Sequence, residues 1–503
     1  MIAHIQTLAF AGIETTPVEV QAHIAAGIPA FTIVGLPDKA VGESRERVRV
    51  AIQSLGLSLP AKRITINLAP ADLAKEGSHY DLPIALALLV IMGIIPQDSL
   101  DNYVALGELS LDGRILQVSG VLPAAMGANA LDKGIICPAP NAREAAWAGD
   151  INILGAESLL AIIKHFKGEQ IISQPSVQIA PPLAHRIDLS QVKGHAHAKR
   201  ALEIAAAGGH NLLMAGPPGT GKSMLASCLP TILPPMSAQE MLDISIIASI
   251  AGNLPEEGLV QMRPFRAPHH SASLPAMVGG GKRAYPGEIS LAHRGVLFLD
   301  EIPEFPRAVL EALRQPLETR NISISRVQAH ITYPADFQLI AAMNPCRCGY
   351  LGDVERSCSK APRCGEDYQN KLSGPLLDRF DMKIMMPMLA PSELFNASPA
   401  ETSEIVASRV QKARLKQQQR YGNGTINADA SKDLLEQTFK WEQDAHDLLQ
   451  QATNKMRLSM RGITRIARVA ATIADLGDKN IINRHAIAEA LSYRHQPNNL
   501  LSA

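Results

Sequence analysis

The amino-acid sequence predicts an α/β fold in which a central domain with a parallel sheet lies between a mixed α/β domain and a helical one. Three observations predict it. A glycine-rich loop at 216–223 follows a short apolar strand pattern and precedes a helical pattern. Further short apolar runs at 295–299 and 337–343 alternate with helical patterns, which is typical of buried parallel strands. Strand patterns then disappear after about residue 390.

The same patterns set the expected domain boundaries. Residues 1–170 read as the mixed α/β domain, and the aperiodic, proline-containing stretch 171–187 reads as a linker. The central domain covers 188–389 and the helical domain 390–503.

Within the outer domains, periodicity assigns individual elements. Residues 18–24 and 64–68 alternate between apolar and polar, which predicts two strands, and Asp112-Gly113 predicts a hairpin turn. Apolar residues recur at three- and four-residue steps from Ile463 to Leu476, on one helix face, and Asn483 is a candidate N-cap for a further helix.

Composition excludes several classes of protein. Lys plus Arg and Asp plus Glu each number 48 in the 503 residues, so basic groups must be concentrated locally if the protein binds nucleic acid. The longest apolar run, Leu82–Ile95, is shorter than the about 20 residues that a membrane span needs, and the first residues lack a signal-peptide pattern. Six cysteines, four of them clustered, favour a reducing compartment. We therefore expect a cytoplasmic protein that does not enter membranes.

The loop at 216–223 matches the phosphate-binding pattern G-x-x-x-x-G-K-[ST] in full. Its glycines let the backbone wrap around phosphate oxygens, and the successive N–H groups and the helix N-terminus supply positive potential. Lys222 can reach the outer phosphates of ATP, and Ser223 can ligate Mg²⁺. The expected nucleotide contacts are Gly216, Pro217, Pro218, Gly219, Thr220, Gly221, Lys222 and Ser223.

Polar residues follow the next two apolar runs. Asp300 would emerge at the carboxyl end of its strand, where it can hold Mg²⁺, and Glu301 can polarise the attacking water. Alone, this pair could also begin a helix, but the P-loop favours the catalytic interpretation. Asn344 ends the following run and in this layout would lie beside the γ-phosphate and help orient water.

Three segments that lead into Asp300-Glu301 carry a family resemblance. Residues 264–271, 279–281 and 286–293 resemble the magnesium-chelatase-like AAA+ ATPases, and the resemblance extends over nearly the whole chain. It implies a P-loop NTPase AAA+ core followed by a C-terminal helical lid.

The same resemblance implies roles for two arginines. Residues 376–381 resemble the family's arginine-finger motif, which places Arg379 at a neighbour's ATP, and 459–462 resemble its sensor-2 motif, which places Arg461 over the phosphates from the lid. Without the resemblance, each could equally lie in a surface salt bridge. ATP sites completed by a neighbour imply an oligomer, and the family expectation is a hexameric ring.

The N-terminal domain resembles the Lon protease domain, an S5-type α/β fold, at 106–115 and Gly120. Lon uses a Ser–Lys dyad. Residues 75–77 resemble the segment that leads to its serine, but no serine stands at the nucleophile's position, and Leu122 lies near the position of the lysine. We therefore expect a Lon-like domain without peptidase activity that serves as a binding or ring-assembly platform.

Four cysteines within 346–364 form a cysteine-rich insertion in the core. Cys346, Cys348, Cys358 and Cys364 could hold Zn²⁺ tetrahedrally in a closed structural site. The alternative is a set of free thiols in a reducing compartment.

Two segments are candidates for DNA-contacting loops inside a ring. One is glycine-rich and ends in Lys282 and Arg283; the other begins at Arg320 and ends at Arg326, where this AAA+ branch carries a β-hairpin. Since the chain has few aromatic residues, phosphate contacts are favoured over base stacking. Alternatively, both segments are solvated loops. The adjacent His269-His270 is expected to be structural rather than a metal site.

The resemblance implies an ATP-driven, ring-forming DNA motor with helicase and branch-migration activity. It would aid recombination of incoming single-stranded DNA during natural transformation. The alternatives are a magnesium-chelatase-type ATPase subunit and a protein-remodelling AAA+ ATPase. The long Lon-like domain argues against the first, and the basic, glycine-rich loops argue against the second.

Overall fold

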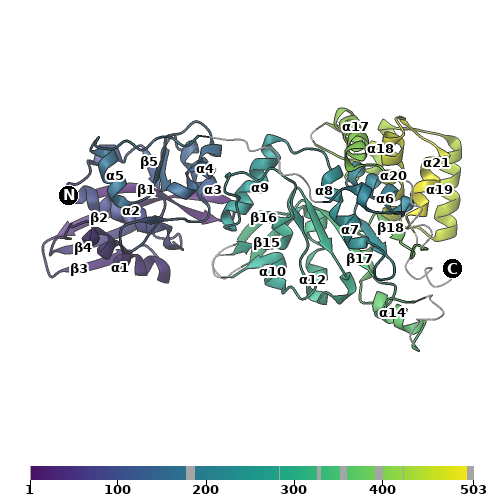
Figure 1. The fold of residues 1–503 in the computed structure, drawn as a ribbon, viewed down its shortest axis with the longest axis horizontal. Coiled ribbons are helices and arrows are strands. Elements are labelled where there is room, and N and C mark those ends of the chain that lie inside the picture. Colours follow the sequence, from purple (N-terminus) through teal and green to yellow (C-terminus); the bar gives the residue numbers. More distant parts are fainter. Residues whose placement is uncertain are drawn as a thin grey trace.

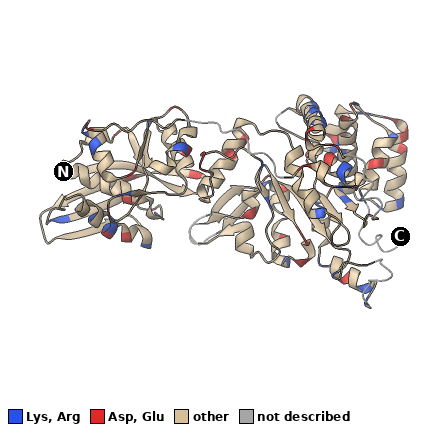
Figure 2. Ribbon diagram, in the orientation of Figure 1, with Lys and Arg blue, Asp and Glu red and all other residues tan. Residues whose placement is uncertain are grey.

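The structure is a computed structural model, and it describes residues 2–176, 187–281, 284–325, 330–351, 359–390, 400–422 and 424–494. The N-terminal domain lies at one end of the long axis, the central domain follows it, and the C-terminal helices lie at the other end (Figure 1). Lys and Arg are dispersed among Asp and Glu over all three parts (Figure 2). Among the described residues, no helix is both long and apolar enough to span a membrane.

The N-terminal domain is built on a seven-stranded mixed sheet with the strand order β3-β4-β2-β1-β5-β8-β9. The long antiparallel hairpin β1–β2 forms its centre, and the strands from β5 onward run parallel. The predicted strands at 18–24 and 64–68 lie in β2 and β4, and Asp112-Gly113 connects the small hairpin β6–β7. The strands are β1 (Ile2–Ala11), β2 (Glu14–Ala25), β3 (Ala30–Val34), β4 (Arg63–Ala69), β5 (Tyr103–Ala105), β6 (Glu108–Leu109), β7 (Ile115–Leu116), β8 (Gly134–Pro138) and β9 (Ile153–Ala156).

Five α-helices accompany this sheet. They are α1 (Lys39–Ser54), α2 (Asp81–Ile91), α3 (Val121–Ala130), α4 (Ala142–Ala145) and α5 (Leu159–Phe166). Helix α2 carries most of the longest apolar run and is buried on nearly all sides. A helix that is apolar all round belongs in a core, which explains this run without a membrane.

The central domain contains a five-stranded parallel sheet with the order β11-β14-β17-β10-β18. Strands β10, β14 and β17 are buried along their whole length, as their apolar runs predict. The strands are β10 (Leu212–Ala215), β11 (Phe265–Arg266), β14 (Val296–Leu299), β17 (Gln338–Met343) and β18 (Met382–Met385).

Short helices and two hairpins connect these strands. The hairpins are β12 (Gly279–Gly280) with β13 (Tyr285–Pro286), and β15 (Asn321–Ser325) with β16 (His330–Pro334). The helices are α6 (Ala196–Gly208), α7 (Lys222–Ser227), α8 (Leu229–Ile232), α9 (Ala238–Ile250), α10 (Leu274–Val278), α11 (Glu288–Leu291), α12 (Arg307–Ala312), α13 (Pro316–Thr319), α14 (Arg363–Gln369) and α15 (Gly374–Leu377).

The C-terminal part is helical, as predicted, apart from a short strand pair. Its elements are α17 (Ser403–Tyr421), α18 (Lys432–Thr438), β19 (Lys440–Trp441), α19 (Gln443–Met456), α20 (Met460–Leu476), β20 (Ile481–Ile482) and α21 (Arg484–Ser492). The predicted apolar face at 463–476 lies on α20, and the Asn483 side chain caps α21 by accepting the Ala486 N–H at 2.9 Å.

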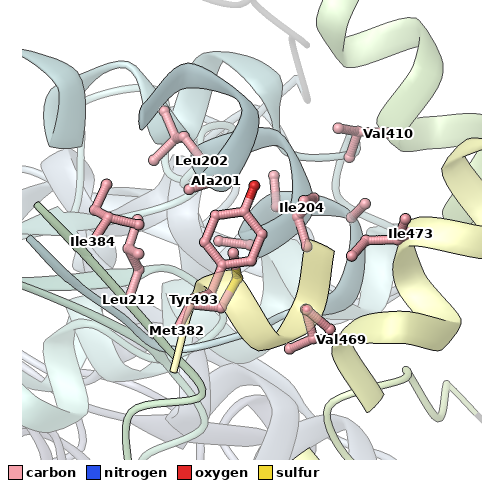
Figure 3. Packing of buried hydrophobic residues seen from close by; sticks show 14 of the residues in the cluster. Ala201, Leu202, Ile204, Leu212, Met382, Ile384, Val410, Val469, Ile473 and Tyr493 are labelled. Atoms are coloured by element: carbon pink, nitrogen blue, oxygen red, sulfur yellow. The ribbon is translucent and has the colours of Figure 1, made fainter. Parts of the chain in front are cut away.

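These C-terminal helices share one hydrophobic core with the central sheet. Figure 3 shows Tyr493 packed among side chains from α6, β10, β18, α17 and α20. The opposite face of the sheet packs against a separate cluster that includes Leu297, Leu339 and Phe380. The helical lid is therefore anchored to the sheet that carries the P-loop.

Candidate nucleotide site

The P-loop leaves the carboxyl end of β10 and enters α7 at Lys222. Gly219 and Gly221 have φ values of +79° and +81°, in the left-handed region where glycine is favoured. A Cβ on Gly216 would collide with the main-chain carbonyl of Met386 at the end of β18. The glycines of the motif are therefore required by the backbone path and by this close approach.

Lys222 is held inside the loop. Its buried ammonium donates hydrogen bonds to the carbonyls of Gly216 at 2.8 Å and Pro217 at 2.7 Å. Burial lowers the pKa of Lys222, while the negative charges of Asp300 and Glu301 oppose that shift. The loop thus fixes a cation where a bound phosphate chain would need it.

Asp300 and Ser223 lie together at the same edge of the sheet. Ser223 Oγ donates to Asp300 Oδ2 at 2.6 Å, and the other carboxylate oxygen accepts the Glu301 N–H at 2.9 Å. A hydroxyl and a carboxylate this close are a donor set that suits Mg²⁺ with phosphate and water as its other ligands. Asp300 follows the buried strand β14 and Ser223 lies in the first turn of α7, so the strand and the helix together set their separation.

Glu301 and Asn344 complete this edge. Glu301 has φ +49°, a left-handed conformation that is rare for a residue with a side chain and recurs at functional sites. Asn344 follows β17, which lies between β10 and β14, and its Oδ1 lies 3.3 Å from Lys222 Nζ. The strand order thus brings these residues beside the P-loop.

His270 is a neighbour of this site that the sequence did not identify. Its Nδ1 lies 3.7 Å from Glu301 Oε2, although the two residues are far apart in the chain. His270 lies in the segment 264–271, which contributes to the family resemblance, but that segment does not indicate which residue either histidine contacts.

Arg379 and Arg461 lie elsewhere. Both line a cavity of about 1120 Å³ at the amino ends of the strands, bordered by Gly209, Gly295 and Asp381. The P-loop lies at the carboxyl ends. Within one chain, Arg461 therefore lies at the edge of the sheet opposite the P-loop, because the lid packs so that α20 begins at that edge.

The lining of this cavity is rich in arginine, and acidic residues form ion pairs with several of these arginines. Arg379 bonds to Glu318, and buried Arg465 lies 3.6 Å from Asp381 and 3.7 Å from Asp378. The arginines that line it are Arg263, Arg294, Arg320, Arg379, Arg414, Arg461, Arg465 and Arg468; the acidic residues are Glu240, Asp243, Glu318, Asp336, Asp381 and Asp429.

Arg320, one of the candidate DNA contacts, lines this cavity. It precedes β15 at the base of the hairpin, and its guanidinium lies 3.4 Å from Asp336 and bonds to Asp429. The candidate segment 320–326 begins at the residue before β15, and the chain turns there: Arg320 has φ +57°. The other candidates, Lys282, Arg283 and Arg326, lie outside the described residues.

Three of the four clustered cysteines meet beside the P-loop. The sulfur atoms of Cys346, Cys348 and Cys364 lie within 4.8 Å of one another, and Cys358 lies outside the described residues. Sulfur ligands on one tetrahedral Zn²⁺ lie about 3.8 Å apart, so the three thiols fit such an ion. A Cβ on Gly349 would lie 2.6 Å from Pro218 Cδ, so the cysteine loop packs directly against the phosphate loop.

In the N-terminal domain, the residues closest to the expected positions of a Ser–Lys dyad are engaged in other contacts. Ser78 Oγ donates to Glu108, and the buried Lys75 ammonium donates to the Pro70 carbonyl. Leu122 is fully buried at the start of α3. Buried Asp81 forms a bidentate pair with Arg47 at 2.6 and 2.9 Å.

Comparison with known proteins covers all three parts of the chain. Family models match "Subunit ChlI of Mg-chelatase" at residues 20–141, "Magnesium chelatase, subunit ChlI" at 188–394 and "Magnesium chelatase, subunit ChlI C-terminal" at 400–494.

Full-length relatives agree with these matches. The chain is 44% identical to the Competence protein ComM of Haemophilus influenzae over 503 residues, 98% of this chain and 97% of that one. It is 44% identical to the protein YifB of Escherichia coli over 97% of this chain and 96% of that one. A Mycobacterium tuberculosis protein, Rv2897c, is 41% identical over 97% of both chains. The chain therefore belongs to the ChlI family of magnesium-chelatase subunits, and the family's AAA+ domain makes it an ATPase.

Proposed function

We propose that the protein is a ring-forming DNA motor driven by ATP hydrolysis, with helicase and branch-migration activity during natural transformation. The proposal of a ring is supported by one observation: Lys222 and Arg379 lie at opposite edges of the same sheet. The DNA role is supported by the name of the relative in Haemophilus influenzae, a competence protein of nearly equal length.

The residues at the carboxyl edge divide the hydrolytic work. Lys222 binds the outer phosphates, and Ser223 with Asp300 would hold Mg²⁺, which would neutralise charge on the phosphate oxygens. Glu301 polarises the attacking water, and Asn344 orients it. Their proximity in one chain supports this division.

In this proposal, a neighbouring subunit supplies the arginines that complete each ATP site. Because Arg379 and Arg461 face away from their own P-loop, they serve the P-loop of the next subunit when the amino edge of one core meets the carboxyl edge of another. A head-to-tail contact of this kind closes into a ring, and a hexamer is the family expectation. The charge that develops on the transferred phosphoryl group is stabilised by such arginines.

The cysteine cluster is proposed as a structural Zn²⁺ site. Cys346, Cys348 and Cys364 provide three thiolates, and Cys358 is the proposed fourth. Such a site would brace the loop that packs on Pro218.

One experiment tests the motor and its main rival. We would measure ATP turnover with and without single-stranded and forked DNA, with Lys222→Ala as the blank. Stimulation of the wild-type protein by DNA, absent from the variant, supports the DNA motor. ATP turnover that ignores DNA contradicts it and favours the rival that the family models suggest, a magnesium-chelatase-type or protein-remodelling ATPase.

A further inference from the structure

The tip of the β1–β2 hairpin is covered, although hairpin turns usually face solvent. Ala11 pairs with Glu14, so Gly12 and Ile13 alone make the turn, and Gly12 has φ +68°. Gly12 is nevertheless buried and Ile13 is half-buried. Something outside the N-terminal domain therefore covers this turn.

The covering element is β16 of the ATPase domain. A Cβ on Gly12 would lie 2.7 Å from Ile331 Cγ2 and 3.5 Å from the Thr332 carbonyl oxygen. Ile13 packs with Ile331 against the hydrophobic cluster on one face of the central sheet. In Figure 1 the β1–β2 ribbon extends from the N-terminal domain toward α9 and β16.

Strand β16 is tied in turn to the β12–β13 hairpin. Tyr333 is buried, and its hydroxyl donates to the Ala284 carbonyl at 2.9 Å. A Cβ on Gly279 would lie 2.7 Å from Ile324 Cδ1, so the two hairpins also touch at their other strands. Ala284 directly follows the basic pair 282–283 in the sequence. The turn at Gly12 and both hairpins therefore form one packed unit.

A second contact of the N-terminal domain reaches the same unit through α9. The Gly120 N–H donates to the Ser249 carbonyl at 3.0 Å, and Ser249 Oγ donates to the buried carboxylate of Glu144 at 2.7 Å. Helix α9 also packs against β13 and α11. The N-terminal domain thus holds the hairpins from two directions.

We propose that the Lon-like domain is a positioning element for the two hairpins that carry the candidate DNA contacts. The turn Gly12-Ile13 braces β16 and, through Tyr333, the β12–β13 hairpin. The response of ATP turnover to DNA depends on this brace, and basal turnover does not, because the neighbours of Gly12 in the ATPase domain are residues of β16. The inference rests on the proposed DNA motor, and it gives the domain a use that requires no protease chemistry.

The test compares two matched serine variants. Ile13→Ser removes the apolar contact at the turn, and Ile28→Ser is the control, since Ile28 is in the same domain and 86% exposed. Hydrogen exchange at the backbone amides of 321–325 and 330–334 reports the brace without any DNA. ATP turnover with and without single-stranded DNA, and anisotropy of labelled DNA, report the function. Ile331→Ser removes the other side of the contact, and Ile13→Leu is the conservative variant.

Ile13→Ser and Ile331→Ser are expected to speed hairpin exchange about tenfold and to weaken DNA stimulation, with basal turnover unchanged. Ile13→Leu and Ile28→Ser should resemble the wild type. The proposal is overturned if Ile13→Ser matches Ile28→Ser in exchange, or if exchange rises while the response to DNA stays intact. A wild-type protein that ignores DNA refutes the motor instead, and exchange alone then decides whether the turn braces the hairpins.

Discussion

The two edges of the central sheet differ in the charges they hold. The carboxyl edge gathers one buried lysine, two carboxylates and an asparagine around the P-loop. The amino edge holds a large cavity whose lining is rich in arginine, including Arg379 and Arg461. In the proposed function, each edge supplies half of what phosphoryl transfer needs, and this difference is the reason that we propose an ATP site shared between two subunits.

The largest expected effect tests the carboxyl edge. Lys222→Ala should abolish ATP turnover, because the loop loses the cation that it holds among its carbonyls. A malachite-green phosphate assay measures this. Lys39→Ala, at a side chain that is 93% exposed, is the matched control. Turnover retained by Lys222→Ala would place hydrolysis at another site.

The next effect tests whether the edges belong to different subunits. Arg379→Ala should lower turnover by about a thousandfold, and Arg461→Ala by less. Mixing inactive Arg379→Ala with inactive Lys222→Ala should restore activity, since some interfaces then pair an intact P-loop with an intact arginine. If mixtures stay inactive while both variants co-assemble, the two edges do not share a site.

A smaller effect concerns the loop that packs on the P-loop. Cys346→Ser should abolish stoichiometric zinc binding and lower the melting temperature, because the loop that packs on Pro218 loses the metal ion that its thiolates would share. Metal analysis and differential scanning fluorimetry measure both. Cys137→Ser, at a cysteine in the N-terminal core, controls for loss of a buried thiol. Unchanged zinc content in Cys346→Ser would contradict the site.

The smallest effect is a pH dependence at the amino edge. Burial lowers the pKa of His210 to about 3, and its Nε2 lies 2.8 Å from Thr472 Oγ1 of the lid. Between about pH 3 and about pH 6.5, His210 binds a proton in the unfolded chain but not in the folded one. The free energy of unfolding should therefore fall as the pH falls from about 6.5 toward 3.

Thermal unfolding of the wild type and His210→Asn isolates this contribution. The neighbouring Asp381, whose pKa is raised by burial, contributes with the opposite sign, so the difference between the two proteins is the quantity to follow. The melting temperature of the variant should fall less on acidification, by about 3 °C. Parallel curves would show that His210 is not the titrating group.

Local patterns predicted the residues of the carboxyl edge well. The P-loop, Asp300, Glu301 and Asn344 each follow a short apolar run, and each run became a buried parallel strand. The carboxyl ends of parallel strands meet at one edge, so their order in the sequence was enough to place them together. The hairpin at Asp112-Gly113 and the cap at Asn483 followed from local turn and capping chemistry in the same way.

Other features depended on contacts between distant segments. The ion pairs of Arg320 depend on Asp336 and Asp429, which lie elsewhere in the chain. His270 lies beside Glu301 only because β11 and β14 pair. The burial of Gly12 against Ile331 is likewise invisible in either segment.

By itself, the sequence determined which residues can bind phosphate, because a P-loop needs only a strand, glycines and a helix in succession. Only the tertiary structure decided where the arginines lie and which hairpins the N-terminal domain braces. The physical reason is that the packing of the lid on the sheet, and of one domain on another, is set by surfaces assembled from many segments. No single stretch of the chain encodes such a surface.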